Sequence, residues 1–87
     1  MQNKMTDSEF DLLDELYFVQ PFGYLLESLG WSEEKLLETL QSACEKGYIK
    51  CLYSPDEEVF ERFDMFKLGR NLYFLATKKG LMEHNAL

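Results

Sequence analysis

Apolar residues recur at helical spacing in the first half of this chain and at strand-like spacing in the second half. Between Thr6 and Pro21 they predict one amphipathic helix, whose buried stripe consists of Phe10, Leu13, Leu16 and Tyr17. The Thr-x-x-Glu pattern at its start is typical of a capping box, in which two side chains satisfy backbone N–H groups reciprocally. Because proline disfavours helical geometry at the preceding residue, we expect this helix to end before Pro21.

Two further helices are predicted before residue 47. The first runs from about Pro21 to Leu29, because proline suits a first helical turn and Gly30 suits the position after a helix end. Ser32 fits the N-cap of a longer third helix that reaches about Lys46. The apolar positions of the third helix fall on one face, which consists of Leu36, Leu37, Leu40, Ala43 and Cys44.

Residues 48–53 and 72–76 are rich in aromatic and β-branched side chains, and they predict two strands. The connection between them is long for a hairpin. Its Ser-Pro-Asp-Glu stretch at 54–57 is typical of a helix start, so a short helical turn is expected there. Thr77 predicts the N-cap of a last short helix that reaches about His84. Together these elements predict one α+β domain, mostly α, over residues 1–87.

This order of elements resembles the winged helix-turn-helix superfamily, in the style of MarR-like and related small bacterial regulators. Residues 36–49 resemble the family's third helix running through a glycine into the wing, and residues 73–81 resemble the return strand and the Thr-x-x-Gly helix start. The resemblance covers about residues 10–84. It implies a winged helix, with a three-helix core, a two- or three-stranded β wing and a short C-terminal helix. It indicates fold rather than function.

In the family that the chain resembles, the third helix enters the DNA major groove. At about 100° per residue, the face opposite the leucines carries mainly carboxylates, and it consists of Glu34, Glu38, Gln41 and Glu45. Helices that read DNA offer mainly cationic and amide side chains, whereas carboxylates would face the phosphates of a duplex. We therefore expect this face to bind a basic or apolar protein surface, with a second copy of the chain as one possible partner.

The charge distribution keeps an alternative open. The formal net charge is −7, with −8 in residues 1–45 and +1 in residues 46–87. Residues 65–82 hold no acid and four bases, which are Lys67, Arg70, Lys78 and Lys79. These bases favour a small DNA-binding regulator that contacts phosphates through its wing. The simpler interpretation is that they solvate a small acidic protein. A less favoured third hypothesis is an acidic inhibitor that imitates a nucleic acid.

The connection between the two predicted strands is unusually apolar, since Phe60, Phe63 and Phe66 fall within seven residues and Met65 lies among them. A plain wing does not need such large side chains. They either fold back and enlarge the core or form a self-association surface, because a contiguous exposed apolar patch marks an interface. Core extension is the preferred interpretation, and a homodimer is the alternative.

No catalytic, phosphate-binding or metal-binding motif is found, so we expect no enzyme, no cofactor and no metal site. Cys44 and Cys51 are expected in the core, with a disulfide, a redox switch or half a metal site as alternatives. His84 is expected at the surface. Trp31 is expected between the second and third helices, with an exposed partner anchor as the alternative. Without a signal-peptide pattern or an apolar run of membrane-spanning length, a cytoplasmic location without membrane contact is expected.

Overall fold

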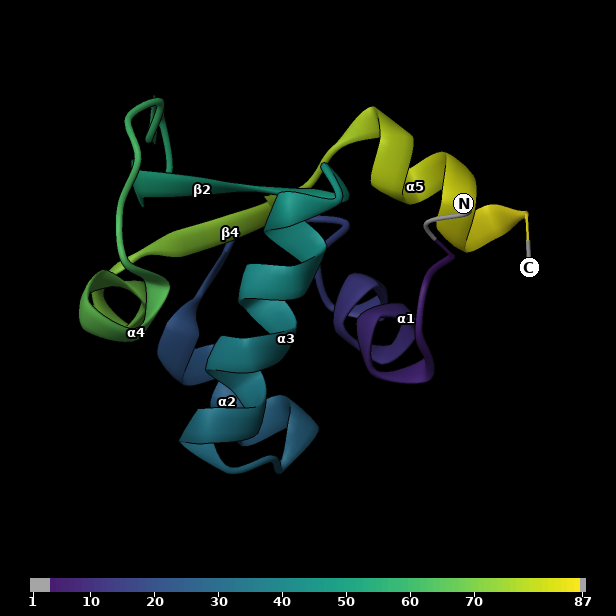
Figure 1. Cartoon of the computed structure of the whole chain (residues 1–87), viewed down its shortest axis with the longest axis horizontal. Coiled ribbons are helices and arrows are strands. Elements are labelled where there is room, and N and C mark those ends of the chain that lie inside the picture. The colour runs from purple at the N-terminus through teal and green to yellow at the C-terminus, as the bar shows by residue number, and fades with distance from the viewer. Residues whose placement is uncertain (1–3, 87) are drawn as a thin grey trace.

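The computed structural model describes residues 4–86, in which a small sheet packs against three helices (Figure 1). The elements in chain order are α1 (Asp7–Asp14), β1 (Gln20–Pro21), α2 (Phe22–Leu29), α3 (Glu33–Glu45), β2 (Ile49–Ser54), β3 (Glu57–Glu58), α4 (Met65–Leu68), a 3-10 turn (Gly69–Asn71), β4 (Tyr73–Ala76) and α5 (Lys78–Asn85). The predicted class, α+β and mostly helical, is confirmed. No helix within residues 4–86 has the length and apolar character needed to cross a membrane.

The sheet has the strand order β1-β4-β2-β3, and every neighbouring pair is antiparallel. The last strand in the sequence therefore lies inside the sheet, between the first two. In its register, Cys51 of β2 and Gln20 of β1 both lie opposite Phe74 of β4. The two predicted strands, 48–53 and 72–76, are present as β2 and β4, and the sheet in the described residues also contains β1 and β3, which are only two residues long.

One hydrophobic core joins the three helices to the sheet. Its largest fully buried apolar side chains are Leu12, Leu13, Leu16, Leu25, Leu36, Leu37, Leu40, Tyr48, Leu72 and Phe74. The stripe predicted for the third helix is buried as expected, except that Cys44 is half-buried. Trp31 is half-buried and packs against this core. Because burying one leucine side chain contributes about 1.5–3 kcal/mol, the cluster is the main source of the stability of the fold.

The predicted helix caps are present in the structure. The hydroxyl of Thr6 accepts a hydrogen bond from the backbone N–H of Glu9 at 3.1 Å, and the Glu9 carboxylate accepts one from the backbone N–H of Thr6 at 2.9 Å. Ser32 caps α3, and Thr77 caps α5. Gly30 ends α2 with a φ of 69°, a left-handed conformation that favours glycine.

The first helix ends before Pro21, as expected, but already at Asp14, so the predicted stripe does not continue through Tyr17. The chain leaves the helix here to join the sheet, where the carbonyl of Leu16 accepts a hydrogen bond from the N–H of Ala76 at 3.0 Å. The Ser-Pro-Asp-Glu stretch at 54–57 forms a tight turn into β3 and does not begin a helix. The helical turn in this connection lies later, at Met65–Leu68, where Asp64 is the N-cap.

Two side chains, Tyr17 and His84, differ from the prediction in their burial. Tyr17 was expected in the buried stripe but is exposed, because the helix has ended before it, and Leu12 lies in the core in addition to Leu13. His84 was expected at the surface but is only 8% exposed. It lies between α5 and α1, where its ring stacks on Phe10 with centroids 4.1 Å apart.

Candidate partner-binding groove

A surface groove of about 710 Å³ lies between the last turns of α3 and the segment 59–65, which runs from the end of β3 to the first residue of α4. The helix contributes Gln41, Cys44 and Glu45 to its lining, and the segment contributes the rest. Two groups of residues that the sequence singled out separately, the acidic face of the third helix and the aromatics of the connection, therefore meet in one place. Their meeting could not be predicted, because the path of the irregular segment depends on tertiary contacts.

The segment 59–65 is fixed to the sheet and to α4 by polar contacts. The N–H of Val59 donates to the carbonyl of Cys51 at 2.9 Å, and the hydroxyl of Tyr53 donates to the carboxylate of Glu61. The second bond lowers the pKa of Glu61 and raises the pKa of Tyr53. Asp64 accepts from the N–H of Phe66 at 2.9 Å and so caps α4. The groove therefore has a defined second wall with a charged carboxylate at Glu61.

The aromatic side chains of the connection divide between core and surface. Phe63 is half-buried and packs against the core, and Met65 is buried in it. Phe60 is 84% exposed, although it lines the groove, and Phe66 is 39% exposed. Core extension therefore applies to Phe63 and Met65. Phe60 is the large apolar side chain that remains available at the groove.

All four residues of the predicted acidic face are exposed on α3. Gln41 and Glu45 line the groove, and the amide of Gln41 donates to the carboxylate of Glu45 at 3.2 Å. Glu34 and Glu38 lie on the turns before them, outside the groove. The groove lining as a whole contains three carboxylates, Glu45, Glu61 and Asp64, and one guanidinium, Arg62, a net formal charge of −2. The groove thus combines apolar side chains with an acidic rim.

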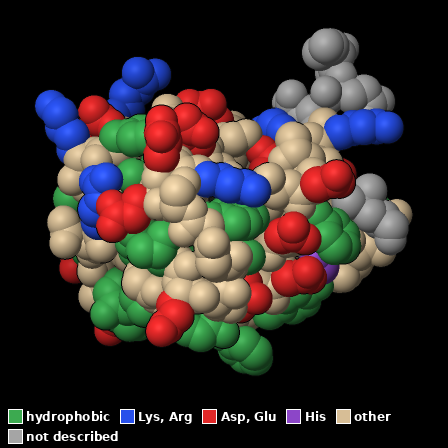
Figure 2. Space-filling view, turned by 90° about the horizontal axis from the view of Figure 1, so that it is seen from below, with side chains coloured by type: hydrophobic (Ala, Val, Ile, Leu, Met, Phe, Trp, Pro, Cys, Tyr) green, Lys and Arg blue, Asp and Glu red, His purple; other side chains and the backbone are tan. Residues whose placement is uncertain are grey.

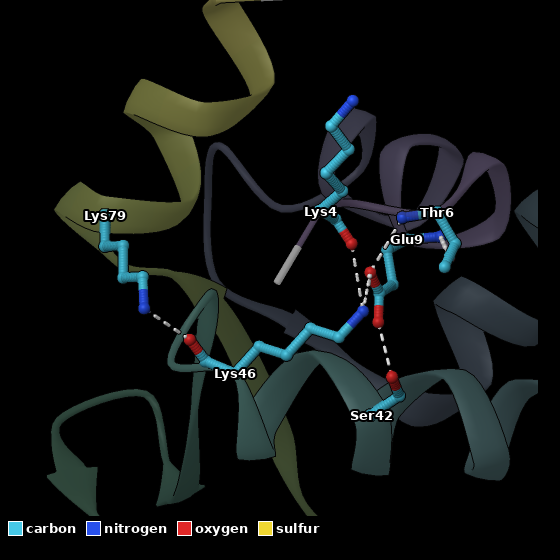
Figure 3. Close-up of polar contacts among 6 residues, drawn as sticks. All are labelled: Lys4, Thr6, Glu9, Ser42, Lys46 and Lys79. Carbon is cyan, nitrogen blue, oxygen red and sulfur yellow. Dashed lines mark hydrogen bonds and ion pairs between the residues drawn. The ribbon is translucent and has the colours of Figure 1, made fainter. Parts of the chain in front are cut away.

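The four bases proposed for the wing do not form one patch. Lys67 and Arg70 come before β4, whereas Lys78 and Lys79 follow it, so the two pairs lie at opposite ends of that strand (Figure 1). The guanidinium of Arg70 donates to the carboxylate of Glu33 at 2.8 Å. The ammonium of Lys79 donates to the carbonyl of Lys46 at 2.8 Å, at the end of α3 (Figure 3). Two of the four cations are therefore engaged within the protein.

Acidic side chains are also widespread elsewhere on the surface. On the face shown in Figure 2, Asp and Glu side chains lie among exposed apolar side chains, while the Lys and Arg side chains lie in the upper half of the view. The lower half of that view therefore shows acidic side chains without neighbouring cations. A phosphate backbone tracking across it would meet anions along its path.

A buried carboxylate fixes the wall of the groove that α3 provides. Glu9 is 1% exposed, and Figure 3 shows its carboxylate between α1 and the end of α3. It accepts hydrogen bonds from the hydroxyl of Ser42 and from the ammonium of Lys46, the latter at 3.0 Å. Burial raises the pKa of Glu9, but the bonds from Ser42, the Thr6 backbone and Lys46 together lower it below the ordinary value. The capping pattern predicted the local bond to Thr6, but not the link to α3.

The rest of the described chain contains no obvious chemical centre. Among residues 4–86, no group of three or more His, Cys, Asp and Glu side chains is arranged to hold a metal ion. A comparison with protein-family models finds no matching family, and searches of curated proteins and of solved structures find no similar protein. The groove and the α3 face therefore have to be interpreted from their own geometry and charge.

Proposed function

We propose that this chain is a non-catalytic winged-helix domain that binds a protein partner. The order of elements supports the fold assignment, since three helices precede an antiparallel strand pair, β2 and β4, and a short helix follows it. The long connection between the pair corresponds to the wing of the family that the sequence resembles. The fold alone does not select the partner, because the same scaffold carries many functions.

The observation that carries the proposed function is the exposed Phe60 in a groove with an acidic rim. Aromatic side chains that enter a partner's pocket often dominate the binding energy of an interface. Charge complementarity around such an anchor increases the association rate and selects among partners. The chemistry of this groove fits a protein segment that presents lysine or arginine next to an apolar side chain. Glu34 and Glu38 extend the same negative potential along α3.

DNA is the alternative ligand, and the charges do not favour it. Binding to a duplex requires several cations that together replace the counterions of the phosphates. Here the bases lie in two separated pairs, and Arg70 is paired with Glu33. The α3 face that would enter a major groove carries Glu34, Glu38 and Glu45. A DNA-binding role would have to depend on Lys67 and Lys78, and on Arg70 and Lys79 only if they left their partners within the protein.

A peptide selection tests the protein-binding role directly. We would pan a random peptide library against the wild-type domain and counter-select against a Phe60→Ser/Glu45→Lys double variant. The expected result is a set of peptides in which lysine or arginine neighbours an apolar residue, with affinity that decreases as salt increases. Phe66→Ser, an exposed aromatic outside the groove, is the matched control and should bind these peptides like the wild type.

Four other results would each change the conclusion. Enrichment of acidic peptides, or binding unaffected by the double variant, would exclude the groove as the binding surface. Affinity for random duplex DNA at low salt that disappears on neutralising Lys67 and Lys78 would favour the DNA-binding alternative. Self-association detected by sedimentation, and abolished by Phe60→Asp, would identify a second copy of the chain as the partner.

A further inference from the structure

Two cysteine side chains meet beneath the groove. Cys44 lies in the last turn of α3 and Cys51 lies in β2, and their sulfur atoms are 3.7 Å apart with both thiols free. The tight reversal between the two elements brings them together, and Gly47 permits it with a φ of 80°. The pair is thus held by one helix, one strand and a short connection.

The two thiols differ in accessibility. Cys44 is half-buried and lines the groove, whereas Cys51 is 3% exposed and lies in the core. A small molecule in the groove therefore reaches the sulfur of Cys44 first. The sulfur of Cys51 lies 3.7 Å from it, in a residue that is buried in the core.

The electrostatics of the pair reinforce this difference. The hydrogen bond from Cys51 lowers the pKa of Cys44 to about 7, against the effects of burial and of the nearby Glu45. The same hydrogen bond, together with burial, raises the pKa of Cys51. Because the thiolate is the nucleophile in sulfur chemistry, the lowered pKa favours Cys44 as the attacking thiol and the raised pKa of Cys51 favours its protonated form.

We propose that Cys44 is a thiol–disulfide exchange site for small disulfides that enter the groove, and that Cys51 is its resolving thiol. The acidic rim formed by Glu45, Glu61 and Asp64 selects cationic disulfides over anionic ones. This inference stands apart from the proposed partner, since it depends only on the two sulfurs and the charge of the groove.

The exchange has two balanced steps. The thiolate of Cys44 attacks one sulfur of the incoming disulfide, a mixed disulfide forms on Cys44, and the first half of the reagent leaves as a thiolate that takes up a proton. Cys51 then loses its proton and attacks the sulfur of Cys44, and the second half leaves as a thiol. The net change oxidises the two cysteines to one intramolecular disulfide and reduces the reagent to two thiols.

The geometry allows the second step with little movement. A disulfide places its sulfurs about 2 Å apart, so the pair must approach by about 1.7 Å from its present 3.7 Å. Rotation about the side-chain bonds of Cys44, on the open side, provides most of this movement. The mixed disulfide occupies the groove until Cys51 releases it.

Intact-mass spectrometry of the whole chain with cystamine, a cationic disulfide, tests the proposal. The wild type should show a transient adduct and then a product lighter by two hydrogen atoms. Cys51→Ser should stop at a stable adduct, which peptide mapping places on Cys44. Cys44→Ser should remain unmodified, because Cys51 is buried. If Cys51 reacts in Cys44→Ser as fast as Cys44 reacts in Cys51→Ser, or if the wild type never releases its adduct, the assignment is wrong.

The preference of the groove for cationic disulfides is tested by comparing reaction rates. At low salt, cystamine should react with the wild type about tenfold faster than oxidised glutathione, an anionic disulfide, after correction for the same ratio with free cysteine. Added salt and a Glu45→Gln/Glu61→Gln variant should both reduce this corrected ratio toward one. A ratio near one in the wild type at low salt would exclude the role of the rim. The comparison uses the native cysteine pair and therefore does not depend on the folding of the cysteine variants.

Discussion

The Nε2 atom of His84 lies 2.7 Å from the Oδ1 atom of Asp14, which links the last helix, α5, to the first helix, α1. The Nδ1 atom of the same ring lies 3.0 Å from the hydroxyl of Tyr17, and Phe10 stacks against the ring. A ring that is 8% exposed thus has a partner at each nitrogen. This histidine docks α5 on the body of the domain.

Replacing His84 with alanine should therefore destabilise the whole domain. The change removes two polar contacts and a stacked ring, and we expect the free energy of unfolding to decrease by about 1–3 kcal/mol. Urea denaturation followed by Trp31 fluorescence measures it. Met82→Ala on the same helix removes a side chain that is 63% exposed and serves as the control. If the two variants are equally stable, the contacts of His84 do not hold α5.

Glu9 should make stability depend on pH in the acid range. The pKa of Glu9 in the folded state lies below its ordinary value. As the pH decreases, the Glu9 carboxylate is therefore protonated in the unfolded chain before it is protonated in the folded protein. The stabilisation is then complete above the unfolded-state pKa of about 4.3 and is lost as the pH decreases through the folded-state pKa.

The variant Glu9→Gln isolates this contribution. At neutral pH we expect it to reduce the free energy of unfolding by about 1–3 kcal/mol, since a buried hydrogen-bonded ion pair with Lys46 is lost. The difference from the wild type should shrink in urea titrations as the pH is lowered below about 4. The exposed Glu38→Gln should stay within about 0.5 kcal/mol of the wild type at neutral pH. A difference that grows with acidity would contradict the assigned direction.

Replacing two helical glycines, Gly80 and Gly23, with alanine should change the stability of the domain in opposite directions. A Cβ at Gly80, at the start of α5, would lie 2.1 Å from the carbonyl oxygen of Tyr48. Gly80→Ala must displace the helix from the backbone, and we expect a loss of about 1–3 kcal/mol or more. A Cβ at Gly23 in α2 meets nothing within 4 Å, so Gly23→Ala should stabilise by about 0.5–1 kcal/mol. Thermal denaturation of both variants should show shifts of opposite sign.

Replacing Phe63 and replacing Phe60 should have different effects on the free energy of unfolding. Phe63 packs against the core, so Phe63→Ser should destabilise the domain by about 1–3 kcal/mol. Phe60 is 84% exposed, so Phe60→Ser should leave the free energy of unfolding within about 0.5 kcal/mol of the wild type. Guanidinium denaturation of both variants checks this. A large loss in Phe60→Ser would mean that this side chain serves folding and is not free for a partner.

The helices were the most predictable part of the fold because their signals are local. Thr6, Ser32 and Thr77 each bond to a backbone N–H three residues further on, and Gly30 and Gly47 follow the two helix ends at positive φ. Such contacts depend only on nearby residues. The sequence predicted these boundaries without knowledge of the rest of the chain.

The errors arose where distant contacts decide the structure. The end of α1 depends on a hydrogen bond from Ala76, sixty residues away along the sequence. The strand β1 exists because Gln20 and Pro21 pair with β4. The burial of His84 requires Phe10 and Tyr17 at the other end of the chain. No short window of the sequence contains these pairs.

The candidate site was predicted in pieces. The pattern identified the acidic face of the third helix and the aromatics of the connection, but as separate surfaces. The groove that joins Glu45 to Phe60 depends on the path of an irregular segment, which has no periodic signal. The sequence favours two core cysteines at Cys44 and Cys51 and leaves a disulfide between them as an alternative, because spacing alone does not place a helix sulfur next to a strand sulfur.

The two outer strands of the sheet restrict how any partner can bind. β1 contains Pro21, which has no N–H to offer, and β3 consists of two glutamates that follow Pro55 by two residues. Edges this short, with proline and like charges, resist the addition of a foreign strand. Recognition through backbone pairing is therefore blocked at both margins, and the same edges should keep concentrated solutions of this aromatic-rich chain free of fibrils.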